Sequence, residues 1–423
     1  MKKSSPLLAL FSVVFVDMLG FGLILPLLPY LAATYGASPL IIGLIGAAYP
    51  LGQFIGAPLV GRLSDRFGRK PLLLFSIAGT FLSLLMLGFA RSIAVILLSR
   101  FFDGLTGGNI TVAQAYIADT TDEKNRAKGM GLIGAAFGLG FILGPASGGF
   151  LSQWGYSVPA FFSAGLSAIN MILITVLLKE SLAKEKRVKK GERAQKRNPL
   201  SNLKNALSKP IAGPLLRSII VFSLAMSLFE SVFSLYAKQR LALNTQTTGY
   251  ILAYVGILVS IVQGGAMGAL TRRFKEHTLL RLGVVTLMFS FLGWAIAPNV
   301  PVLMVILIPL SLSSGILSTI LRSSLSKSVL PRETGEIMGT SAAMESLTRI
   351  AAPALGGFLI GVAAWAPGLL SSLLLGGLVI YTARLLRLHV PIPTENEEPS
   401  GVDVFGRSCV IGDPGCSLVE KVS

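Results

Sequence analysis

The amino-acid sequence predicts an all-α polytopic membrane protein built from two six-helix bundles that are related by a parallel internal repeat. Three observations support this fold class: the composition, the spacing of the apolar runs, and a repeat within the chain. Of the 423 residues, 52% are hydrophobic and 13% are charged, and the mean hydropathy is +0.70. Soluble globular proteins carry about 25% charged residues. The composition therefore argues against a water-soluble fold.

The apolar runs are long enough to cross a bilayer, which takes about 20 helical residues. We expect twelve membrane helices, six on each side of a polar segment. Prolines and glycines lie largely inside these runs, and membrane helices tolerate them because neighbouring helices satisfy the freed backbone groups. The runs lie near residues 7–30, 40–60, 71–89, 93–117, 127–151, 157–178, 215–237, 247–270, 278–297, 301–324, 335–361 and 366–386, with a short turn expected at 366–368 before the last helix.

The connections between the runs alternate in charge, which predicts their orientation because cytoplasmic loops are enriched in Lys and Arg. Every connection after an even-numbered helix is basic. The connections after odd-numbered helices carry at most two basic residues. We therefore expect a multi-pass cell-membrane protein whose two termini and even connections are cytoplasmic. The basic residues of the even connections are Arg62, Arg66, Arg69 and Lys70, then Lys124, Arg126 and Lys128, then Arg272, Arg273 and Lys275, and finally Lys327 and Arg332.

The longest polar segment sets the domain boundaries. Residues 179–214 are rich in Lys and Arg and separate an N-terminal bundle, 1–178, from a C-terminal bundle, 215–390. This basic segment suits either a solvated cytoplasmic linker or a surface for anionic lipid. Residues 391–423 are rich in Pro and Glu near their start and predict a disordered cytoplasmic tail.

Two matches between the halves predict a duplicated six-helix unit. Residues 61–73 align with 268–280 at an offset of 207, and residues 145–151 align with 353–359 at an offset of 208. Because the two offsets nearly agree, both copies have the same orientation in the membrane. Parallel repeats of this kind place a substrate site at their interface near the middle of the bilayer.

The motifs resemble those of the major facilitator superfamily over all twelve helices, and this resemblance implies the major facilitator fold. The loop Gly61-x-Leu63-x-Asp65-Arg66-x-Gly68-Arg69-Lys70 is similar to the superfamily's signature between helices 2 and 3. Arg100-x-x-Asp103-Gly104 is similar to the motif built on a membrane arginine, with Asp103 where Gln is more usual. Gly140-x-x-x-Gly144-Pro145-x-x-Gly148-Gly149 resembles the antiporter motif of drug:proton exporters, and Leu19-Gly20-x-Gly22-x-x-x-Pro26-x-x-Pro29 resembles the helix 1 motif of their twelve-helix branch, which includes the tetracycline exporters.

Two carboxylates lie inside predicted membrane helices. Asp17 is in the first run, where a charged Asp costs about 2.5–3.5 kcal/mol at the helix centre and so needs a function or a partner. Two interpretations fit it: a carboxylate that takes up and releases a proton, and one that only hydrogen-bonds across a helix pair. Glu230, with Phe222, Phe229 and Phe233 expected around it, is suited to line a cavity or to bind a proton or a cationic substrate.

Two charged pairs are predicted on helix faces. Arg100 and Asp103 are three residues apart and are expected to pair, either as a structural ion pair or as part of proton coupling. Glu345 and Arg349 are four residues apart and are expected to form a similar pair, with Arg322 adding a nearby charge. For this second pair we favour a structural or gating role over substrate contact.

Glycines and one acid complete the candidate residues. Gly134 and Gly138, and also Gly140, Gly144 and Gly148, recur every four residues, a spacing that lets another helix approach closely. In the loop after helix 2, Asp65 is an acid among bases and is expected to hold a cytoplasmic gate through Arg126 or a helix N-terminus. The second copy has Arg272 at the corresponding place, so only the first copy is expected to make that contact.

No metal site and no cofactor are expected. The glycines at 43–46 and 107–108 lack the lysine of a nucleotide-binding loop, so a gradient has to supply the energy. The histidines, His277 and His389, lie outside the membrane runs, and Cys409 and Cys416 lie in the tail. We expect a protein that is not an enzyme, whose partners are a small-molecule substrate, protons and the lipid bilayer, without nucleic acid, and which acts as a monomer.

The resemblance implies a proton-coupled antiporter that exports small amphipathic compounds, cationic ones included, as in antibiotic efflux. A metabolite symporter or uniporter on the same fold is the first alternative, and the antiporter motif argues against it. A transporter-like membrane receptor without flux is the second alternative. The membrane carboxylates Asp17 and Glu230 argue against that one, since a receptor has no need of a proton carrier.

Overall fold

The computed structural model describes residues 6–183, 185, 187, 205–209, 211–330, 333–385, 401–403, 408–409 and 416–417. For residues 6–7, 123–128, 383–385, 401–403, 408–409 and 416–417 it describes the backbone alone. The first half contains α1 (Pro6–Ile24), α2 (Leu28–Thr34), α3 (Pro39–Phe67), α4 (Arg69–Gly88), α5 (Ile93–Thr106), α6 (Asn109–Thr120), α7 (Glu123–Leu151), η1 (Ser152–Trp154) and α8 (Ser157–Leu177). The second contains α10 (Ala212–Leu241), α11 (Thr245–Ile261), η3 (Val262–Ala266), α12 (Met267–Arg273), α13 (Glu276–Ile296), α14 (Val300–Lys327), α15 (Thr334–Val362) and α16 (Ala366–Leu385).

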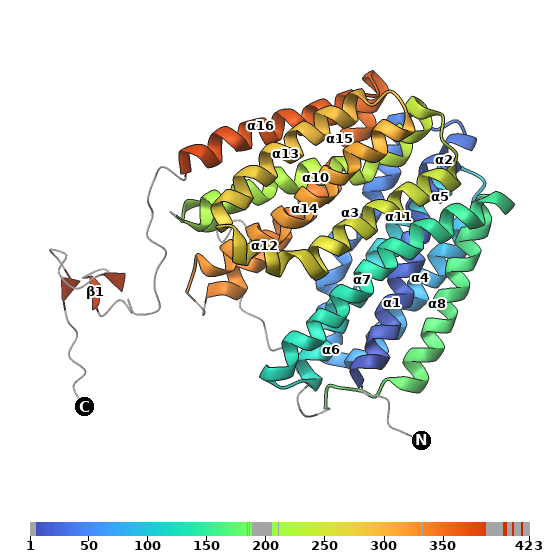
Figure 1. Cartoon of the computed structure of the whole chain (residues 1–423). Helices are drawn as coiled ribbons and strands as arrows, with labels where there is room; N and C mark the ends of the chain where they lie inside the picture. The colour runs from blue at the N-terminus through green and yellow to red at the C-terminus, as the bar shows by residue number, and fades with distance from the viewer. Residues whose placement is uncertain are drawn as a thin grey trace.

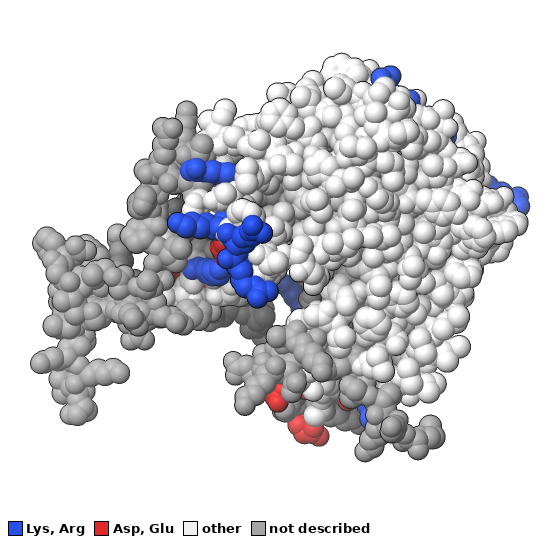
Figure 2. Space-filling view, in the orientation of Figure 1, with Lys and Arg blue, Asp and Glu red and all other residues white. Residues whose placement is uncertain are grey.

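These helices supply the twelve expected crossings. Nine helical segments of the described chain are long and apolar enough to span a membrane, and ten if α1 and α2 count as one bent span. The remaining two are α15, which contains Glu345 and Arg349, and α16, whose apolar stretch Ala366–Thr382 is shorter. The visible surface is broad and largely free of charged side chains, as lipid contact requires, and Lys and Arg gather beside α12 (Figure 2). The chain is therefore a multi-pass membrane protein.

Two crossings that the sequence predicts as continuous are interrupted. The first bends by 41° between α1 and α2, next to Pro26 and Pro29, because proline lacks a backbone N–H and cannot continue the hydrogen-bond ladder. The fourth breaks at Gly107 and Gly108. There the Ser76 hydroxyl from α4 donates to the carbonyl of Thr106 and accepts from the N–H of Gly108, which satisfies backbone groups that the break leaves free.

The other departures from the predicted spans are local. A π-helical turn, η3, joins α11 to α12 within the eighth crossing. The turn before the last helix lies at 363–365 rather than at 366–368, since α16 already begins at Ala366. Ala366 and Pro367 occupy the first helical turn, where a missing proline N–H costs nothing.

The twelve crossings pack as two bundles. In the first half α1 lies against α7 and α8, α3 against α5, and α4 against α8; in the second half α10 lies against α15 and α16, and α13 against α14 and α16. Two extensive helix contacts join the halves, α3 with α15 and α7 with α11, and α10 also touches α2 and α3. In Figure 1 the bundles meet near α2 and diverge toward α6 and α12.

The contact between the halves is confined to one end of the molecule. We call this end, which holds the connections at 35–38, 152–156, 242–244 and 363–365, the odd-loop end, and the opposite one the even-loop end. At the odd-loop end the backbones touch: a β-carbon at Gly43 would lie 3.0 Å from the Cα of Gly357, and one at Gly249 would lie 3.1 Å from the Cα of Gly149. One apolar core also runs through both halves here, including Leu27, Leu31 and Ile42 from the first and Leu235, Ile251 and Ile360 from the second.

Toward the even-loop end the same helices part. Along α7 and α11 the contact ends near Gly138, where a β-carbon would meet the Ser260 Oγ at 3.5 Å. Beyond that point, a β-carbon at Gly134, Gly264 or Gly339 would meet no neighbouring side chain or helix of the described chain within 4 Å. The molecule is closed between its halves at the odd-loop end and open at the even-loop end.

Within the expected disordered tail, the structure describes seven residues. They form three short antiparallel strands, β1 (Gly401–Asp403), β2 (Ser408–Cys409) and β3 (Cys416–Ser417), in the order β2-β1-β3. The other tail residues, and most of the expected linker, lie outside the described residues.

Candidate functional site

The break in the fourth crossing places a polar site inside the first bundle. Because α5 ends at Thr106 and α6 starts again at Asn109, the Asn109 side chain lies at a helix start and turns toward α1. Its Nδ2 donates a hydrogen bond to Oδ2 of Asp17. Asp17 thus has the hydrogen-bond partner that the cost of a membrane carboxylate demands.

Arg100 and Asp103 form the expected ion pair beside this site. Arg100 Nη1 lies 3.1 Å from Oδ2 of Asp103, with 3% and 6% of the two side chains exposed, and Thr80 also hydrogen-bonds the Asp103 carboxylate. The Arg100 Nε has no hydrogen-bond partner among the described residues. Loss of either member of such a buried pair leaves an uncompensated charge, which is strongly destabilising.

Asp17, Arg100, Asp103 and Asn109 line one small cavity. Its wall also contains Tyr49 from α3 and Ser167 from α8, with apolar side chains from α1 and α4. Two acids and one base therefore share a cavity inside the first bundle, and the two acids are close enough to influence each other electrostatically. A group of this kind can hold a proton or a charged part of a ligand.

The second bundle adds two charged groups. Glu230 on α10 is exposed, whereas Phe229 and Phe233 beside it are 1% and 0% exposed and pack with Phe291 in the core. The phenylalanines therefore do not surround the carboxylate, as the sequence suggested. Arg349 on α15 is also exposed, and its charge acts on Glu230 and, across the halves, on Tyr49. Arg349 therefore lies close enough to both Glu230 and the first half to influence groups in each.

The expected pair between Glu345 and Arg349 is wrong. Oε2 of Glu345 lies 2.8 Å from Nη2 of Arg322 on α14, and its Oε1 accepts from the Ser341 hydroxyl at 3.3 Å. Arg322 comes from a neighbouring helix, so four-residue spacing within α15 could not reveal it. Glu345 therefore joins α14 to α15.

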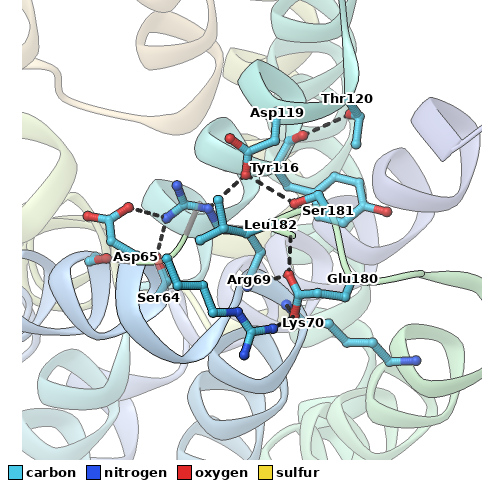
Figure 3. Close-up of polar contacts among 12 residues, drawn as sticks. Ser64, Asp65, Arg69, Lys70, Tyr116, Asp119, Thr120, Glu180, Ser181 and Leu182 are labelled. Atoms are coloured by element: carbon cyan, nitrogen blue, oxygen red, sulfur yellow. Dashed lines mark hydrogen bonds and ion pairs between the residues drawn. The ribbon is translucent and has the colours of Figure 1, made fainter. Parts of the chain in front are cut away.

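The loop between α3 and α4 is organised around Arg69 rather than around Asp65 (Figure 3). The Arg69 side chain is 9% exposed, and its guanidinium donates to Asp65 at 2.6 Å, to Ser64 at 2.6 Å and to Asp119 at 2.9 Å. Asp65 is half-exposed, and its cationic partner is Arg69. The Arg126 side chain, its expected partner, lies outside the described residues.

The start of α4 is held by a residue from beyond the last helix of the first bundle. Glu180 accepts from the backbone N–H groups of Arg69 at 2.8 Å and Lys70 at 3.3 Å, which caps the helix at its positive end (Figure 3). Gly68 just before it has φ +109°, a conformation that favours glycine. Lys70 Nζ donates to the Thr175 carbonyl at 2.7 Å. The loop is therefore tied to α8 and to the start of the linker.

The other motif residues of this loop lie at its margin. Arg66 is exposed and its guanidinium lies 5.0 Å from the centre of the Phe67 ring. Gly61 faces α6, where a β-carbon would lie 3.5 Å from the Thr111 side chain. Sequence reasoning missed Asp119 and Glu180. The available signal was that each is an acid at the end of an apolar run, at the same membrane surface as the basic loop.

The glycines of the antiporter-like motif bring α7 against two helices. A β-carbon at Gly140 would lie 2.6 Å from the Met18 Cβ, and one at Gly144 would lie 2.6 Å from the Cα of Gly22. Gly148 faces the Leu23 carbonyl in the same way. On the other side of α7, the Pro145 and Gly149 backbones contact α11 of the second half. The motif therefore joins α1, which carries Asp17, to the contact between the halves.

Comparisons with known proteins agree with this architecture. The model of the Major Facilitator Superfamily matches residues 10–353. Tetracycline resistance protein, class C, from Escherichia coli is 32% identical over 367 residues, which cover 84% of this chain and 89% of that protein. Multidrug resistance protein 2 from Bacillus subtilis is 30% identical over 352 residues, which cover 83% and 87%.

Solved structures give the same fold. The crystal structure of the human organic anion transporter TETRAN covers 89% of this chain and 98% of its own, with 26% identity and a TM-score of 0.65. A bacterial homologue of the human lysosomal transporter Spinster superposes with a TM-score of 0.75 at 14% identity, over 93% of this chain and all of its own. At that identity the second likeness shows the fold alone.

Proposed function

The chain belongs to the Major Facilitator Superfamily, a family of transporters rather than enzymes, and from that premise we propose that it is a proton-coupled antiporter that exports small amphipathic compounds. The observation that supports this proposal best is the cavity in which Asp17, Asn109, Arg100 and Asp103 meet inside the first bundle. The Asp103 carboxylate is paired with the Arg100 guanidinium. Asp17 accepts a hydrogen bond from a neutral amide, so it can gain or lose a proton without breaking an ion pair.

The shape of the molecule supports alternating access. The halves touch at the odd-loop end and part at the even-loop end, so the groups that face the space between them are reached from one side. We propose that the even-loop end is cytoplasmic, because its connections hold the excess of Lys and Arg. On this orientation in the cell membrane, the structure is open to the cytoplasm, the side from which an exporter loads.

We propose that the substrates are small amphipathic compounds of the antibiotic type. Two relatives are named for resistance to tetracycline and to multiple drugs. The space between the halves offers both an acid, Glu230, and a base, Arg349, so it can accept compounds of either charge. The remaining partners in the proposal are protons and the bilayer, with no cofactor or nucleic acid, and the chain acts as a monomer.

The proposal is tested with purified protein in proteoliposomes, with an imposed pH gradient and a panel of antibiotics and dyes. The wild type is expected to concentrate one or more compounds against their gradient, and collapse of the pH gradient should abolish this uphill transport. Asp17→Asn should keep substrate binding and downhill exchange but lose uphill transport, because it removes the titrating group and keeps the shape.

Glu230→Gln is the matched control, since it neutralises a carboxylate outside the first-bundle cavity. It is expected to change the apparent affinity for cationic substrates more than coupling. Uphill transport by Asp17→Asn with a normal pH dependence would move the role to Asp103 or Glu230. If none of the three carboxylates affected coupling, a facilitator would replace the antiporter.

A further inference from the structure

We propose that Tyr30 positions the two halves by latching the odd-loop end shut, and that breaking its hydrogen bonds shifts the protein toward the state that is open there. This inference rests on the proposed function only in requiring that the halves move relative to each other. Tyr30 lies on α2, directly after the bend that follows α1, and is 3% exposed. Beyond the bend α2 lies against α10 of the second half, which brings the side chain to the contact between the halves.

The phenol of Tyr30 reaches two groups of the second half. Its Oη donates to the Leu243 carbonyl at 2.9 Å and lies 2.7 Å from the Thr248 hydroxyl. Leu243 lies in the turn between α10 and α11, and Thr248 is in the first turn of α11. The turn is tight: Ala242 has φ +51°, a left-handed conformation that is uncommon for a residue other than glycine. This conformation sets the direction of the Leu243 carbonyl.

The hydroxyl network is shared between the halves. The Thr248 hydroxyl is also 2.9 Å from the Asn244 carbonyl, so the two hydroxyls have two protons for three contacts. When Thr248 donates to Tyr30, Tyr30 donates to Leu243, and the phenol is satisfied entirely by the second half. Separation of the halves would leave this phenol without either partner.

The Tyr30 ring makes contacts of its own. Nζ of Lys238, at the end of α10, lies 5.4 Å from the ring centre, within the range of a cation–π contact. The Tyr156 ring of the first half lies 6.5 Å away, centre to centre. The close approaches of α3 to α15 and of α7 to α11 at this end involve glycine and proline backbones, and among the described residues no backbone hydrogen bond joins the halves there. Tyr30 adds directional bonds to this contact between the halves, which we call the seam.

The chain supplies a matched control in Tyr35. It lies at the end of the same helix and its hydroxyl also donates to a carbonyl, that of Ala90, at 2.7 Å. Ala90 belongs to the same half as Tyr35, so this bond does not cross the seam. Tyr30→Phe and Tyr35→Phe thus delete the same atom and the same kind of bond, and only the first acts between the halves.

The reporter is a cysteine at Thr245, in a background where Cys409 and Cys416 are replaced by serine. Thr245 is 3% exposed, its carbonyl faces Gly149 across the seam, and its hydroxyl has no hydrogen-bond partner in the described structure, so Thr245→Cys removes no bond. The measurement is the rate at which a polar maleimide labels this cysteine in detergent-purified protein without substrate. Because both ends are accessible in detergent, the result does not depend on membrane orientation or on coupling.

Tyr30→Phe is expected to raise the labelling rate about 2- to 10-fold, the range for loss of one net hydrogen bond. Thr248→Val should raise the labelling rate as well. In the double variant the fold increase should be smaller than the product of the two single increases, because both substitutions remove the same contact. Tyr35→Phe should label at the wild-type rate. Circular dichroism and size-exclusion profiles that match the wild type establish that the variants are folded.

Two outcomes would overturn the latch: Tyr30→Phe labelling at the wild-type rate, or the same increase in Tyr30→Phe and Tyr35→Phe. Faster labelling of Tyr30→Phe alone, together with a wild type that never transports uphill, would instead retain the latch and reject proton antiport. Uphill transport by the wild type with an unchanged labelling rate in Tyr30→Phe would retain proton antiport and reject the latch.

Discussion

Arg69 and Glu276 occupy matching places in the two halves and carry opposite charges. They are 207 residues apart, the offset of the repeat, and each lies at the start of a helix, α4 and α13. Each also pairs with the end of another crossing: Arg69 with Asp119 at 2.9 Å, and Glu276 with Lys327 at 2.7 Å. The partners are themselves 208 residues apart. Both halves thus have an ion pair at this place, but the acid and the base have exchanged positions.

The two matched pairs should differ in their contribution to stability because they differ in burial. The Arg69 side chain is 9% exposed, whereas Glu276 and Lys327 are 41% and 57% exposed. Arg69→Gln should lower the free energy of unfolding by about 1–3 kcal/mol, since it leaves Asp119 and Asp65 without their base. Glu276→Gln should cost about 0–1 kcal/mol, as surface pairs do. Thermal unfolding in detergent measures both, and equal shifts would refute the ranking.

Asp65→Asn should slow transport while leaving insertion and folding largely intact. The carboxylate is half-exposed at the even-loop end, and Arg69 keeps Asp119 and Ser64 as partners when the charge of Asp65 is lost. The initial rate of substrate uptake into proteoliposomes measures the effect, with Arg66→Gln in the same loop as the control. A rate equal to the wild type would leave this residue with only a topological role.

The helices of this fold could be predicted because membrane helices depend on length and apolar composition, which one sequence displays. The interruptions could not be placed as well. Gly107 and Gly108 lie in an apolar run, and the sequence does not show that the Ser76 hydroxyl from another helix helps local backbone bonds to satisfy the groups at a break there. Predictions from spacing within one helix succeeded for Arg100 and Asp103 and failed for Glu345, whose partner comes from α14.

The candidate site shows the same limit. Asp17 was marked by its charge in an apolar run, but its partner Asn109 is a neutral residue 92 positions away whose role depends on where α6 begins. Asp119 and Glu180 hold the loop through contacts with Arg69 that span 50 and 111 residues. Such contacts depend on three-dimensional packing, which spacing along one chain does not encode.

The close approach of α7 to α1 predicts unequal effects of one added methyl group. Gly144→Ala would bring a β-carbon to 2.6 Å from the Cα of Gly22, so the helix backbones must shift, and overpacking of this kind costs about 1–3 kcal/mol. Gly134→Ala, ten residues earlier in the same helix, meets open space and should be neutral or slightly stabilising. Melting temperatures in detergent compare the two, and a larger loss for Gly134→Ala would contradict the structure.

The orientation proposed above predicts where reporters are active. A reporter fused after Arg193 should be active in the cytoplasm, and one inserted within Gln153–Ser157, at the odd-loop end, should be active outside the cell. A fluorescent protein detects the cytoplasmic location, and an enzyme that is active only outside the cytoplasm detects the external one. The reverse pattern would invert the proposed topology and would make the structure open to the outside.

The apolar core shared by both halves at the odd-loop end makes the balance between the two open states depend on temperature. Opening that end would bring water to side chains such as Leu31 and Ile360, which are buried in the closed form. Exposure of apolar surface carries a positive heat-capacity change, and the hydrophobic contribution weakens on cooling. Cold should therefore shift the protein toward the state open at the odd-loop end. The population of that state then depends on the hydration of apolar side chains as well as on bound substrate.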